Sequence, residues 1–386
     1  MANDAGWRAN ARQRIRRRPP ISLVRLLAVF LKIGCIGFGG GMAVIALMER
    51  EFVQKRRLLS GEEFLHGVGL GQVLGSFAAN AAFFIGYRLF GVAGGILSTG
   101  VFMMPSLALV IALAHFYFLY HSIPALQAAV VGLGPVVIAL ILAAAWSLGR
   151  QVLRTPVALC IAGAALAAGA LKTNAVWVLL GAGMAGLLLP NRRRDGPGGS
   201  FAALAIPATV GRFSLLGSTA ITFLKTGMVF FGGGFVLVPV LHDRLVTGLH
   251  WLSPREFLDG VAISNLTPGP IAVLATFAGF RVAGVAGALV ATAALLAPAM
   301  GLMLLLSAQY ERYRDEPRVQ QFLAGVNPAV TGLIVSAAVL LGGSAITSWH
   351  GWILCGVSLM LLQKFRWHPA FVLAIGFAAG YFGLMP

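Results

Sequence analysis

One stretch of sequence occurs twice in the chain, and this duplication constrains the fold more than any other feature. Residues 30–41 read FLKIGCIGFGGG, and residues 223–234, at an offset of 193 positions, read FLKTGMVFFGGG. A match held over about a hundred positions indicates an internal duplication, so the two halves should form homologous helical repeats. The same offset, without a gap, pairs Glu63 with Glu256, Gly67 with Gly260, Gly86 with Gly279, Arg88 with Arg281, Gly91 with Gly284, Pro105 with Pro298, Pro124 with Pro317 and Pro135 with Pro328.

The composition places these repeats in a lipid bilayer. The chain is 58% hydrophobic and only 11% charged. Apolar runs of about 20 residues, long enough to cross a bilayer, recur along the sequence. A soluble domain would carry about a quarter of its residues as charged side chains, which excludes that class. No small-residue cleavage site follows the first apolar run, so no cleavable leader is expected. We therefore predict an all-α polytopic protein of the plasma membrane.

The apolar segments divide the chain into four regions. Residues 1–20 form a basic arm, and residues 21–190 and 212–386 form the two repeats. Residues 191–211 are rich in Arg, Gly and Pro and are predicted to form a linker. Within the repeats, apolar segments are expected near 21–48, 62–87, 91–119, 124–149, 156–171 and 174–190, and again near 213–241, 256–280, 284–309, 319–344, 349–363 and 368–384.

The orientation of the two repeats depends on how many segments of each repeat cross the bilayer. The last two segments of each repeat have about 16 residues, short of the roughly 20 that a full crossing needs. An odd number of crossings gives inverted repeats, whereas an even number gives parallel ones. The loop charges favour the inverted arrangement, although Arg192, Arg193 and Arg194 would then lie outside.

The formal net charge of +17 indicates contact with lipid and not with nucleic acid. Basic residues lie in loops and in the N-terminal arm, where they are typical of the cytoplasmic side of a membrane protein. We therefore expect a cytoplasmic N-terminus and no nucleic-acid partner. The three cysteines lie in apolar segments and indicate neither a disulfide nor a metal site. The arm contains Arg8, Arg12, Arg14, Arg16, Arg17 and Arg18, and the cysteines are Cys35, Cys160 and Cys355.

Two glycine clusters are the main candidates for a substrate site. Consecutive glycines interrupt a helix, because each costs roughly 1 kcal/mol relative to alanine. In lipid, a broken helix is tolerated only where it is buried or lines a cavity. The half-helix after such a break presents free N–H groups at its positive end, which suits an anion. Close helix packing is the alternative. The clusters are Gly39, Gly40 and Gly41 in the first repeat and Gly232, Gly233 and Gly234 in the second.

A lysine precedes each glycine cluster by two helical turns. Lys32 and Lys225 therefore share a helix face with Gly39 and Gly232. An ammonium group inside an apolar segment is costly and is by default a functional hypothesis, with snorkelling to the interface as the alternative. We expect both lysines to balance the charge of a bound anion.

A second break is predicted within residues 264–270 of the second repeat. Two prolines around Gly269 cannot continue a helix, and Asn265 and Thr267 offer hydrogen bonds. The corresponding stretch of the first repeat keeps an amide, Gln72, but has no proline. The second break is therefore expected in the second repeat and not in the first. Gln72, Asn265, Thr267 and Gly269 are all candidates for substrate contact.

Further polar residues are candidates for a vestibule or for proton coupling. Arg88 and Arg281 lie at the ends of their apolar segments. Their role there is either to anchor the helix at the membrane interface or to attract an anion. Glu49, His242 and Asp243 follow the glycine clusters and could couple transport to protons, although surface solvation explains them as well. The paired glutamates, Glu63 and Glu256, each follow a serine by three positions, which predicts helix capping boxes.

Motifs for catalysis or for a bound cofactor are missing. The chain has no phosphate-binding GxxxxGK[ST] loop, no HExxH and no G-x-S-x-G elbow. We therefore expect a transporter driven by gradients, with no cofactor, and not an enzyme.

The duplicated motif resembles the chromate ion transporter family, whose halves each open with F-x-K-x-G-x-x-x-F-G-G. The resemblance includes residues 30–40 and 223–233, the TPGP stretch at 267–270, and residues 281–288. It implies antiparallel halves and efflux of chromate, a tetrahedral dianion shaped like sulfate. Gly41 and Gly234 stand where that family often has proline, and residues 75–77 replace its first-half P-G-P. These departures bear on the first-half site and on the substrate.

We predict a transporter that exports chromate or a related oxyanion by alternating access. Uptake or exchange of sulfate or another small anion is the nearest alternative, and a passive channel is a third option. A membrane-embedded enzyme acting on a lipid phosphate has only His242 and Asp243 to support it, and neighbouring residues on a helix point in different directions. The oligomeric state is left open, with a homodimer as one option.

Overall fold

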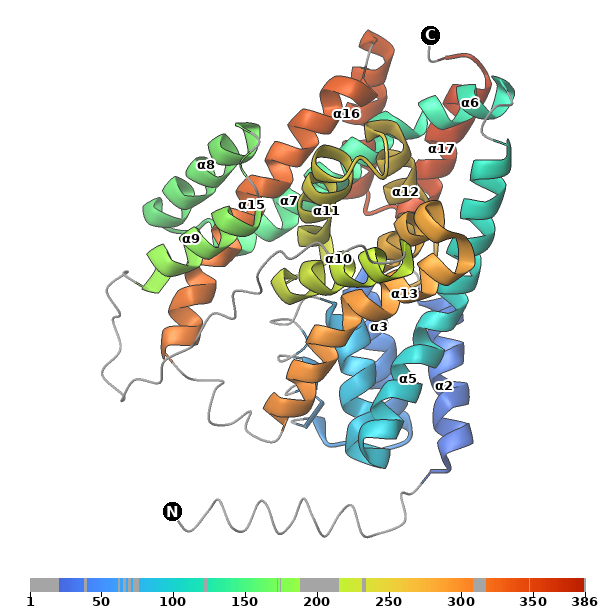
Figure 1. Ribbon diagram of the computed structural model, residues 1–386, viewed down its shortest axis with the longest axis vertical. Helices are drawn as coiled ribbons and strands as arrows, with labels where there is room; N and C mark the ends of the chain where they lie inside the picture. Colours follow the sequence, from blue (N-terminus) through green and yellow to red (C-terminus); the bar gives the residue numbers. More distant parts are fainter. Residues whose placement is uncertain are drawn as a thin grey trace.

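The structure, a computed structural model, is built of helices (Figure 1). No strand occurs among the described residues, as the all-α prediction requires. The arm predicted at 1–20 and the linker predicted at 191–211 lie outside these residues. The structure describes residues 21–37, 40–61, 63–64, 67–68, 71, 76–120, 124–171, 173, 175–187, 215–230, 234–307, 317–346 and 348–384.

The first repeat begins with a broken helix and ends with two short apolar helices. Ser22 caps the first helix through its hydroxyl oxygen, which accepts from the amide of Arg25. Thr155 caps a later helix whose first residue is Pro156, where the missing N–H costs nothing. The elements are α2 (Leu23–Ile36), α3 (Gly40–Glu49), the π-helical η1 (Arg50–Lys55), α5 (Phe77–Tyr120), α6 (Pro124–Val131), α7 (Leu133–Val152), α8 (Pro156–Ala170) and α9 (Ala175–Leu187).

Most elements of the second repeat have a counterpart at the 193-residue offset in the first. The second repeat consists of α10 (Leu215–Val229), η2 (Gly234–Val236), α11 (Leu237–His242), η3 (Asp243–Gly248), α12 (Pro254–Leu266), η4 (Ile271–Val273), α13 (Leu274–Ser307), α15 (Pro317–Ala345), α16 (Trp349–Gln363) and α17 (Pro369–Tyr381). Helix α15 corresponds to α6 and α7 together. The family resemblance and the duplication both predict this repetition, and the structure confirms the two-repeat, all-α architecture.

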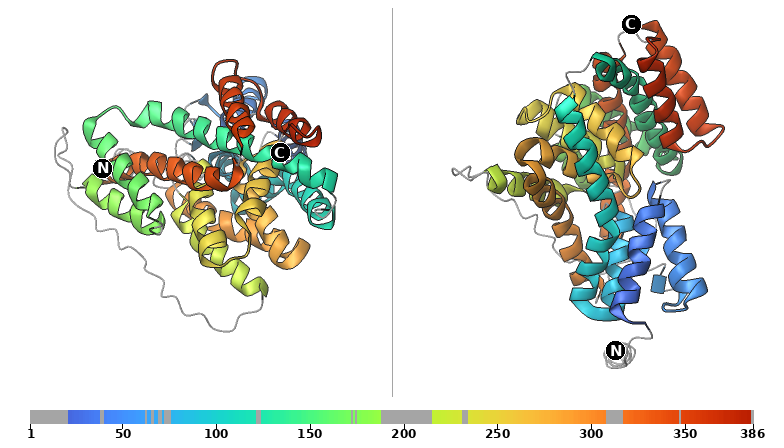
Figure 2. Two further views of the ribbon diagram at one scale, coloured as in Figure 1. Left: turned by 90° about the horizontal axis from the view of Figure 1, so that it is seen from above. Right: turned by 90° about the vertical axis from the view of Figure 1, so that its right-hand side faces the viewer.

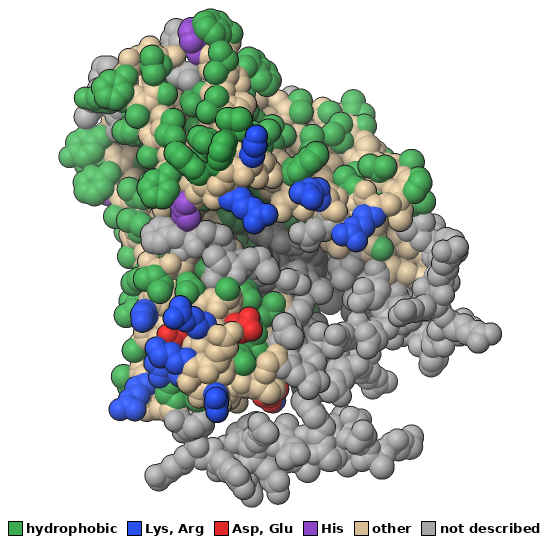
Figure 3. Space-filling model, turned by 180° about the vertical axis from the view of Figure 1, so that it is seen from behind, with side chains coloured by type: hydrophobic (Ala, Val, Ile, Leu, Met, Phe, Trp, Pro, Cys, Tyr) green, Lys and Arg blue, Asp and Glu red, His purple; other side chains and the backbone are tan. Residues whose placement is uncertain are grey.

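Four of the described helices are long and apolar enough to cross a membrane. They form two repeat-related pairs, and large hydrophobic side chains are exposed on several other helices, among them Trp177 (70%) and Phe371 (66%). Figure 3 shows hydrophobic side chains over much of the upper part of one face. The chain is therefore a multi-pass membrane protein. The four helices are Ala78–Tyr120, Ala128–Arg150, Ile271–Leu305 and Ala324–Gly343.

A sharp reversal divides α5 and α13 each into a short and a long arm. Gly91 (φ 67°) and Gly284 (φ 59°) adopt the left-handed conformation at the two turns, where glycine is favoured. In α5 the two arms lie against each other, as the hydrogen bond of 3.3 Å from the Thr99 hydroxyl to the Ala79 carbonyl shows. The boundary predicted between residues 87 and 91 therefore marks a hairpin of two helices.

The long arms of the two repeats run in opposite directions. Ser106 of α5 contacts Pro268, and farther along the same arm Phe118 packs on Phe277 with ring centroids 5.3 Å apart. The long arm of α5 therefore runs parallel to the short arm of α13, and so antiparallel to the long arm of α13. This arrangement matches the inverted repeats that the loop charges favour.

The two repeats interlock through their C-terminal helix pairs. Helices α8 and α9 pack on α15 of the other repeat, whereas α16 and α17 pack on α7 and α6 (Figures 1 and 2). Glycines allow the close approach: a side chain at Gly325 would overlap the backbone of Ala182, and one at Gly132 would overlap that of Gly376. The Gln363 amide also donates to the Ala143 carbonyl over 3.0 Å.

Candidate functional site

Both glycine clusters interrupt their helices, as predicted. Helix α2 ends at Ile36, Gly37 has non-helical torsions, and α3 begins at Gly40. Helix α10 ends at Val229, and a 3₁₀ turn begins at Gly234. Gly40 and Gly41 therefore lie in the first turn of α3. The other predicted cluster members, Gly39, Gly232 and Gly233, lie outside the described residues.

The second predicted break is present in the second repeat. Helix α12 ends at Leu266, Thr267 is extended, and Gly269 takes a positive φ of 111°. The chain becomes helical again at Ile271. Residues 72–75 of its first-repeat counterpart, including Gln72, lie outside the described residues. The non-helical Ser76 precedes α5 there.

These two breaks meet across the repeat interface. The Gly269 amide donates to the carbonyl of Gly37 over 3.0 Å, and the Ser106 hydroxyl donates to the Pro268 carbonyl. We call this contact, formed by Gly37, Ser106, Pro268 and Gly269, the junction. The 3₁₀ turn η2 lies beside η4, so two half-helix N-termini begin close to the junction. Positive helix ends and the absence of Asp and Glu from residues 260–307 make this region favourable for an anion.

The polar side chains of α12 donate to its own carbonyls in this conformation. The Thr267 hydroxyl donates to Ser264 over 3.1 Å, and the Asn265 amide donates to Val261 over 2.8 Å. Thr267 is buried, whereas Asn265 is half-buried. Backbone N–H groups are therefore the main donors that the junction can offer to an anion.

The structure places Lys32 in a basic surface cavity and not at the junction. This cavity of about 450 Å³ is lined by Arg25, Lys32, Glu51, Lys55 and Arg56. Although burial acts to raise the pKa of Glu51, hydrogen bonds from Lys55 and Arg56, each 3.3 Å long, lower it overall. Figure 3 shows Lys and Arg side chains gathered with acidic ones at the lower end of the molecule.

The second lysine has different surroundings. Lys225 is half-buried in α10, and no hydrogen bond or ion pair to another described residue holds it. The repeat-related positions of Glu51, Lys55 and Arg56 are Arg244, Gly248 and Leu249. The basic cavity is therefore a feature of the first repeat, and the two lysines are not equivalent in environment.

Three of the proposed vestibule residues, His242, Asp243 and Arg281, line one cavity of about 710 Å³. Asp243 accepts a hydrogen bond from the Ala175 amide at the start of α9, so it connects the two repeats. Burial raises the pKa of Asp243, an effect that Arg244 and the Ala175 amide oppose. Burial lowers the pKa of His242. We call this cavity the vestibule; Glu49 and Arg88 lie elsewhere.

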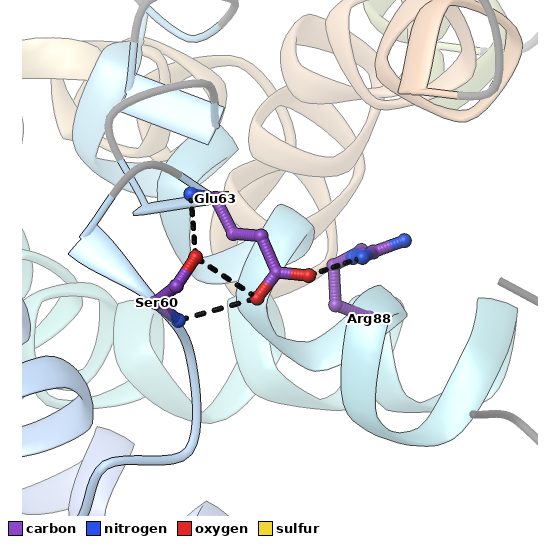
Figure 4. Close-up of polar contacts among 3 residues, drawn as sticks. All are labelled: Ser60, Glu63 and Arg88. Atoms are coloured by element: carbon purple, nitrogen blue, oxygen red, sulfur yellow. Dashed lines mark hydrogen bonds and ion pairs between the residues drawn. The ribbon is translucent and has the colours of Figure 1, made fainter. Parts of the chain in front are cut away.

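The two arginines related by the 193-residue offset, Arg88 and Arg281, each form an ion pair with a capping glutamate. Arg88 donates to Glu63 over 2.6 Å, and Glu63 in turn caps its helix with Ser60 (Figure 4). In the second repeat, Arg281 donates to Glu256 over 3.0 Å, beside the capping box that Ser253 completes. The capping boxes were predicted, but their ion pairs were not. Each pair ties the short arm of a long helix to the preceding helix start.

Two polar residues of the interior were not predicted from the sequence. Asp259 is 3% exposed and accepts a hydrogen bond of 2.7 Å from the hydroxyl of Tyr117. Ser106, fully buried, follows one of the paired prolines. An acid within an apolar segment was the available signal for Asp259. Among the described residues, no group of three or more His, Cys, Asp and Glu could hold a metal ion.

Several known proteins are similar to this chain over most of its length. A probable chromate transport protein of Synechococcus elongatus is 34% identical over 85% of this chain and 86% of its own. The chromate transport protein of Cupriavidus metallidurans is 31% identical over 90% of both chains, and that of Pseudomonas aeruginosa is 32% identical over 83% and 81%. No solved structure matches the chain.

The family comparison repeats the division found in the sequence. The model of the family described as Chromate transporter matches residues 24–187 and again residues 218–381. These two matches contain the two breaks, the junction and the vestibule. The chain therefore belongs to the chromate transporter family, with one copy of the family's domain in each half.

Proposed function

We propose that this protein exports chromate, or a related tetrahedral oxyanion, across the plasma membrane by alternating access. The single observation that supports this most directly is the junction, where a broken helix of one repeat meets the second break of the other. Broken helices facing each other between inverted repeats are the usual setting of a transporter's substrate site. Membership of the family supports chromate as the substrate.

The proposed site uses backbone amides more than side chains. The half-helices that begin at Gly40, Gly234 and Ile271 would offer their positive ends to the anion, and Thr267 and Gly269 would shape the site. Gly39, Gly232, Gly233, Gln72 and Asn265 remain proposed contacts. Lys225 would balance the charge at the site, whereas Lys32 and the basic cavity would collect anions at the surface.

The membrane potential supplies a driving force for export. Moving one negative charge out of a cell with an inside-negative potential gains roughly 2.3 kcal/mol per 100 mV, and chromate carries two. We propose a cytoplasmic N-terminus, in line with the arginines of residues 1–20, and repeats that act as two units, 21–190 and 212–386. Reorientation of one unit against the other would expose the junction to each side in turn.

Transport into everted membrane vesicles tests the proposal. Everted vesicles that contain the protein should take up chromate faster than empty vesicles, with saturation, and a lumen-positive potential should accelerate uptake. Lys225→Ala should raise the chromate concentration needed for half-maximal uptake. Uptake only by right-side-out vesicles would instead mean import, and uptake without saturation would mean a channel.

Sulfate exchange is the second candidate, because the proposed contacts recognise a tetrahedral dianion and not chromium. Unlabelled sulfate added to the same vesicles decides between the two. Weak competition at a large excess of sulfate supports chromate export. Uptake of radiolabelled sulfate at the same rate as chromate would support a general anion exchanger.

A further inference from the structure

Asp259 differs from the other charged residues of the described chain by its burial. It is 3% exposed, whereas every other Asp, Glu, Lys and Arg whose side-chain burial the structure describes is at least partly accessible. An ionised carboxylate without water is very costly unless a donor stabilises it, and such a group commonly takes up a proton instead. A lone buried carboxylate in a membrane transporter is therefore a functional hypothesis by default.

Among the described residues, the one hydrogen bond to this carboxylate comes from the other repeat. Tyr117, near the end of the long arm of α5, donates its hydroxyl proton to Asp259 Oδ2 over 2.7 Å. The Tyr117 ring packs on Phe277 of α13, with centroids 5.7 Å apart. Movement of α12 away from α5 would therefore remove this donor from the carboxylate.

Its position along α12 links the vestibule to the junction. Glu256, one turn before Asp259, lines the vestibule together with Arg281 of α13, and Thr267 lies at the other end of α12. With a rise of 1.5 Å per residue, Asp259 and Thr267 are about 12 Å apart along the axis. Along α12, Asp259 is therefore closer to the vestibule residue Glu256 than to Thr267 beside the junction.

Other ionisable groups also occur on α12 and on the elements packed against it. On α12 itself, Arg255 is exposed and Glu256 pairs with Arg281 of α13. On α5, Tyr117 is the direct partner, and the His115 ring packs on Phe280. On α11, His242 packs on Phe257. The remaining ionisable residues are Tyr87, Arg88 and Tyr120 of α5, Arg150 at the end of α7, Arg318 at the start of α15 and Tyr381, 58% exposed, at the end of α17; η4 has none.

A proton fits this site better than a metal cation. Alkali and divalent cations with oxygen ligands typically take about six of them. Asp259 and Tyr117 offer one carboxylate and one phenol, and no cluster of acids lies nearby among the described residues. The repeat-related positions hold His66 and Tyr310, so the carboxylate occurs in the second repeat only.

We propose that Asp259 is a proton-binding site that controls the separation of the two repeats, with Tyr117 as its positioning residue. The ionised carboxylate holds α12 to α5 through the Tyr117 hydroxyl. Protonation neutralises the carboxylate, so that α12 can leave α5 without exposing a buried charge to the apolar interior. Reorientation of the repeats then requires one bound proton. This inference rests on the proposed transport function.

The pH dependence of chromate exchange in proteoliposomes tests the proposal. In the wild type, exchange should slow at alkaline pH by about tenfold per pH unit, because one proton is required. Asp259→Asn imitates the neutral carboxyl, so its exchange rate should change less than about twofold over the same pH range. Asp259→Glu, which keeps a titratable carboxyl, should keep the pH dependence of the wild type. Tyr117→Phe should keep a pH dependence but shift its midpoint. An unchanged wild-type profile in Asp259→Asn would overturn the proposal.

A second measurement does not depend on transport. Infrared difference spectra between acidic and alkaline buffer should contain a carboxyl band that Asp259→Asn lacks. Absence of this band from the wild type, or its persistence in the variant, would overturn the proposal even if the variant transports nothing. A wild type that exchanges no chromate but shows the band would count against the proposed function and not against the proton site.

Discussion

At the scale of single residues, the ionisable groups of this protein differ in how far they are buried. His242 and Asp243 line the vestibule, where water reaches them, whereas Asp259 is enclosed between α5, α12 and α13. The vestibule histidine packs edge-on against Phe257, with ring centroids 5.5 Å apart. Burial lowers the pKa of His242 from its ordinary value, so it stays neutral in the folded protein where an unfolded chain would already be protonated.

The stability of the protein should therefore fall on mild acidification, in part because of His242. Since the unfolded state binds a proton more readily than the folded state, folding loses free energy as pH drops below about 6.5. His242→Gln should reduce the loss of melting temperature between about pH 7.5 and pH 5.5 in detergent. The exposed His250, replaced by Asn, serves as the control and should melt like the wild type. Equal losses in both variants and the wild type would contradict this assignment.

At the scale of elements, glycines set the distances between helices. A Cβ at Gly227 of α10 would overlap the Leu295 carbonyl of α13, and one at the repeat-related Gly34 of α2 would overlap the Phe102 carbonyl of α5. Both overlaps are with backbone, which cannot give way as a flexible side chain can. Gly301, also on α13, has no atom within 4 Å of such a Cβ.

These glycines should therefore respond differently to the same substitution. Gly227→Ala should destabilise the protein by about 1–3 kcal/mol, the usual range for overpacking. Gly301→Ala should be neutral or stabilise its helix by up to roughly 1 kcal/mol. Thermal melting of the purified protein in detergent measures both. A melting temperature of Gly227→Ala equal to that of Gly301→Ala would contradict the packing described here.

Much of the element order could be predicted from sequence because the duplication makes each feature visible twice. The offset of 193 placed the breaks before Gly40 and Gly234, and the Ser-x-x-Glu patterns identified both capping boxes. The partners of these elements could not be predicted. The junction joins Gly37 to Gly269, and the buried acid meets Tyr117, 142 positions away. Such long-range pairings depend on packing and have no periodic signal in the sequence.

At the scale of the whole molecule, neither repeat is complete alone. Helices α8 and α9 are covered by α15 of the other repeat, and α16 and α17 cover α7 and α6 in return. The long arms of α5 and α13 run antiparallel, and the junction forms where Gly37 of the first repeat meets Gly269 of the second. A site shared in this way changes whenever the repeats move relative to each other, as alternating access requires.

The most direct test of the shared site is chromate uptake by everted vesicles that contain Gly269→Ala. An alanine there would need the unfavourable φ of 111° and would place its Cβ against the Ser106 hydroxyl, which disturbs the junction without removing a charge. We predict that Gly269→Ala lowers the uptake rate per protein in the membrane at least about tenfold, which corresponds to about 1.4 kcal/mol of activation free energy. The control Gly301→Ala should take up chromate at the wild-type rate. If Gly269→Ala does not reach the membrane, Ser106→Ala, which adds no bulk, takes its place. Uptake at the wild-type rate by the junction variant would contradict the account.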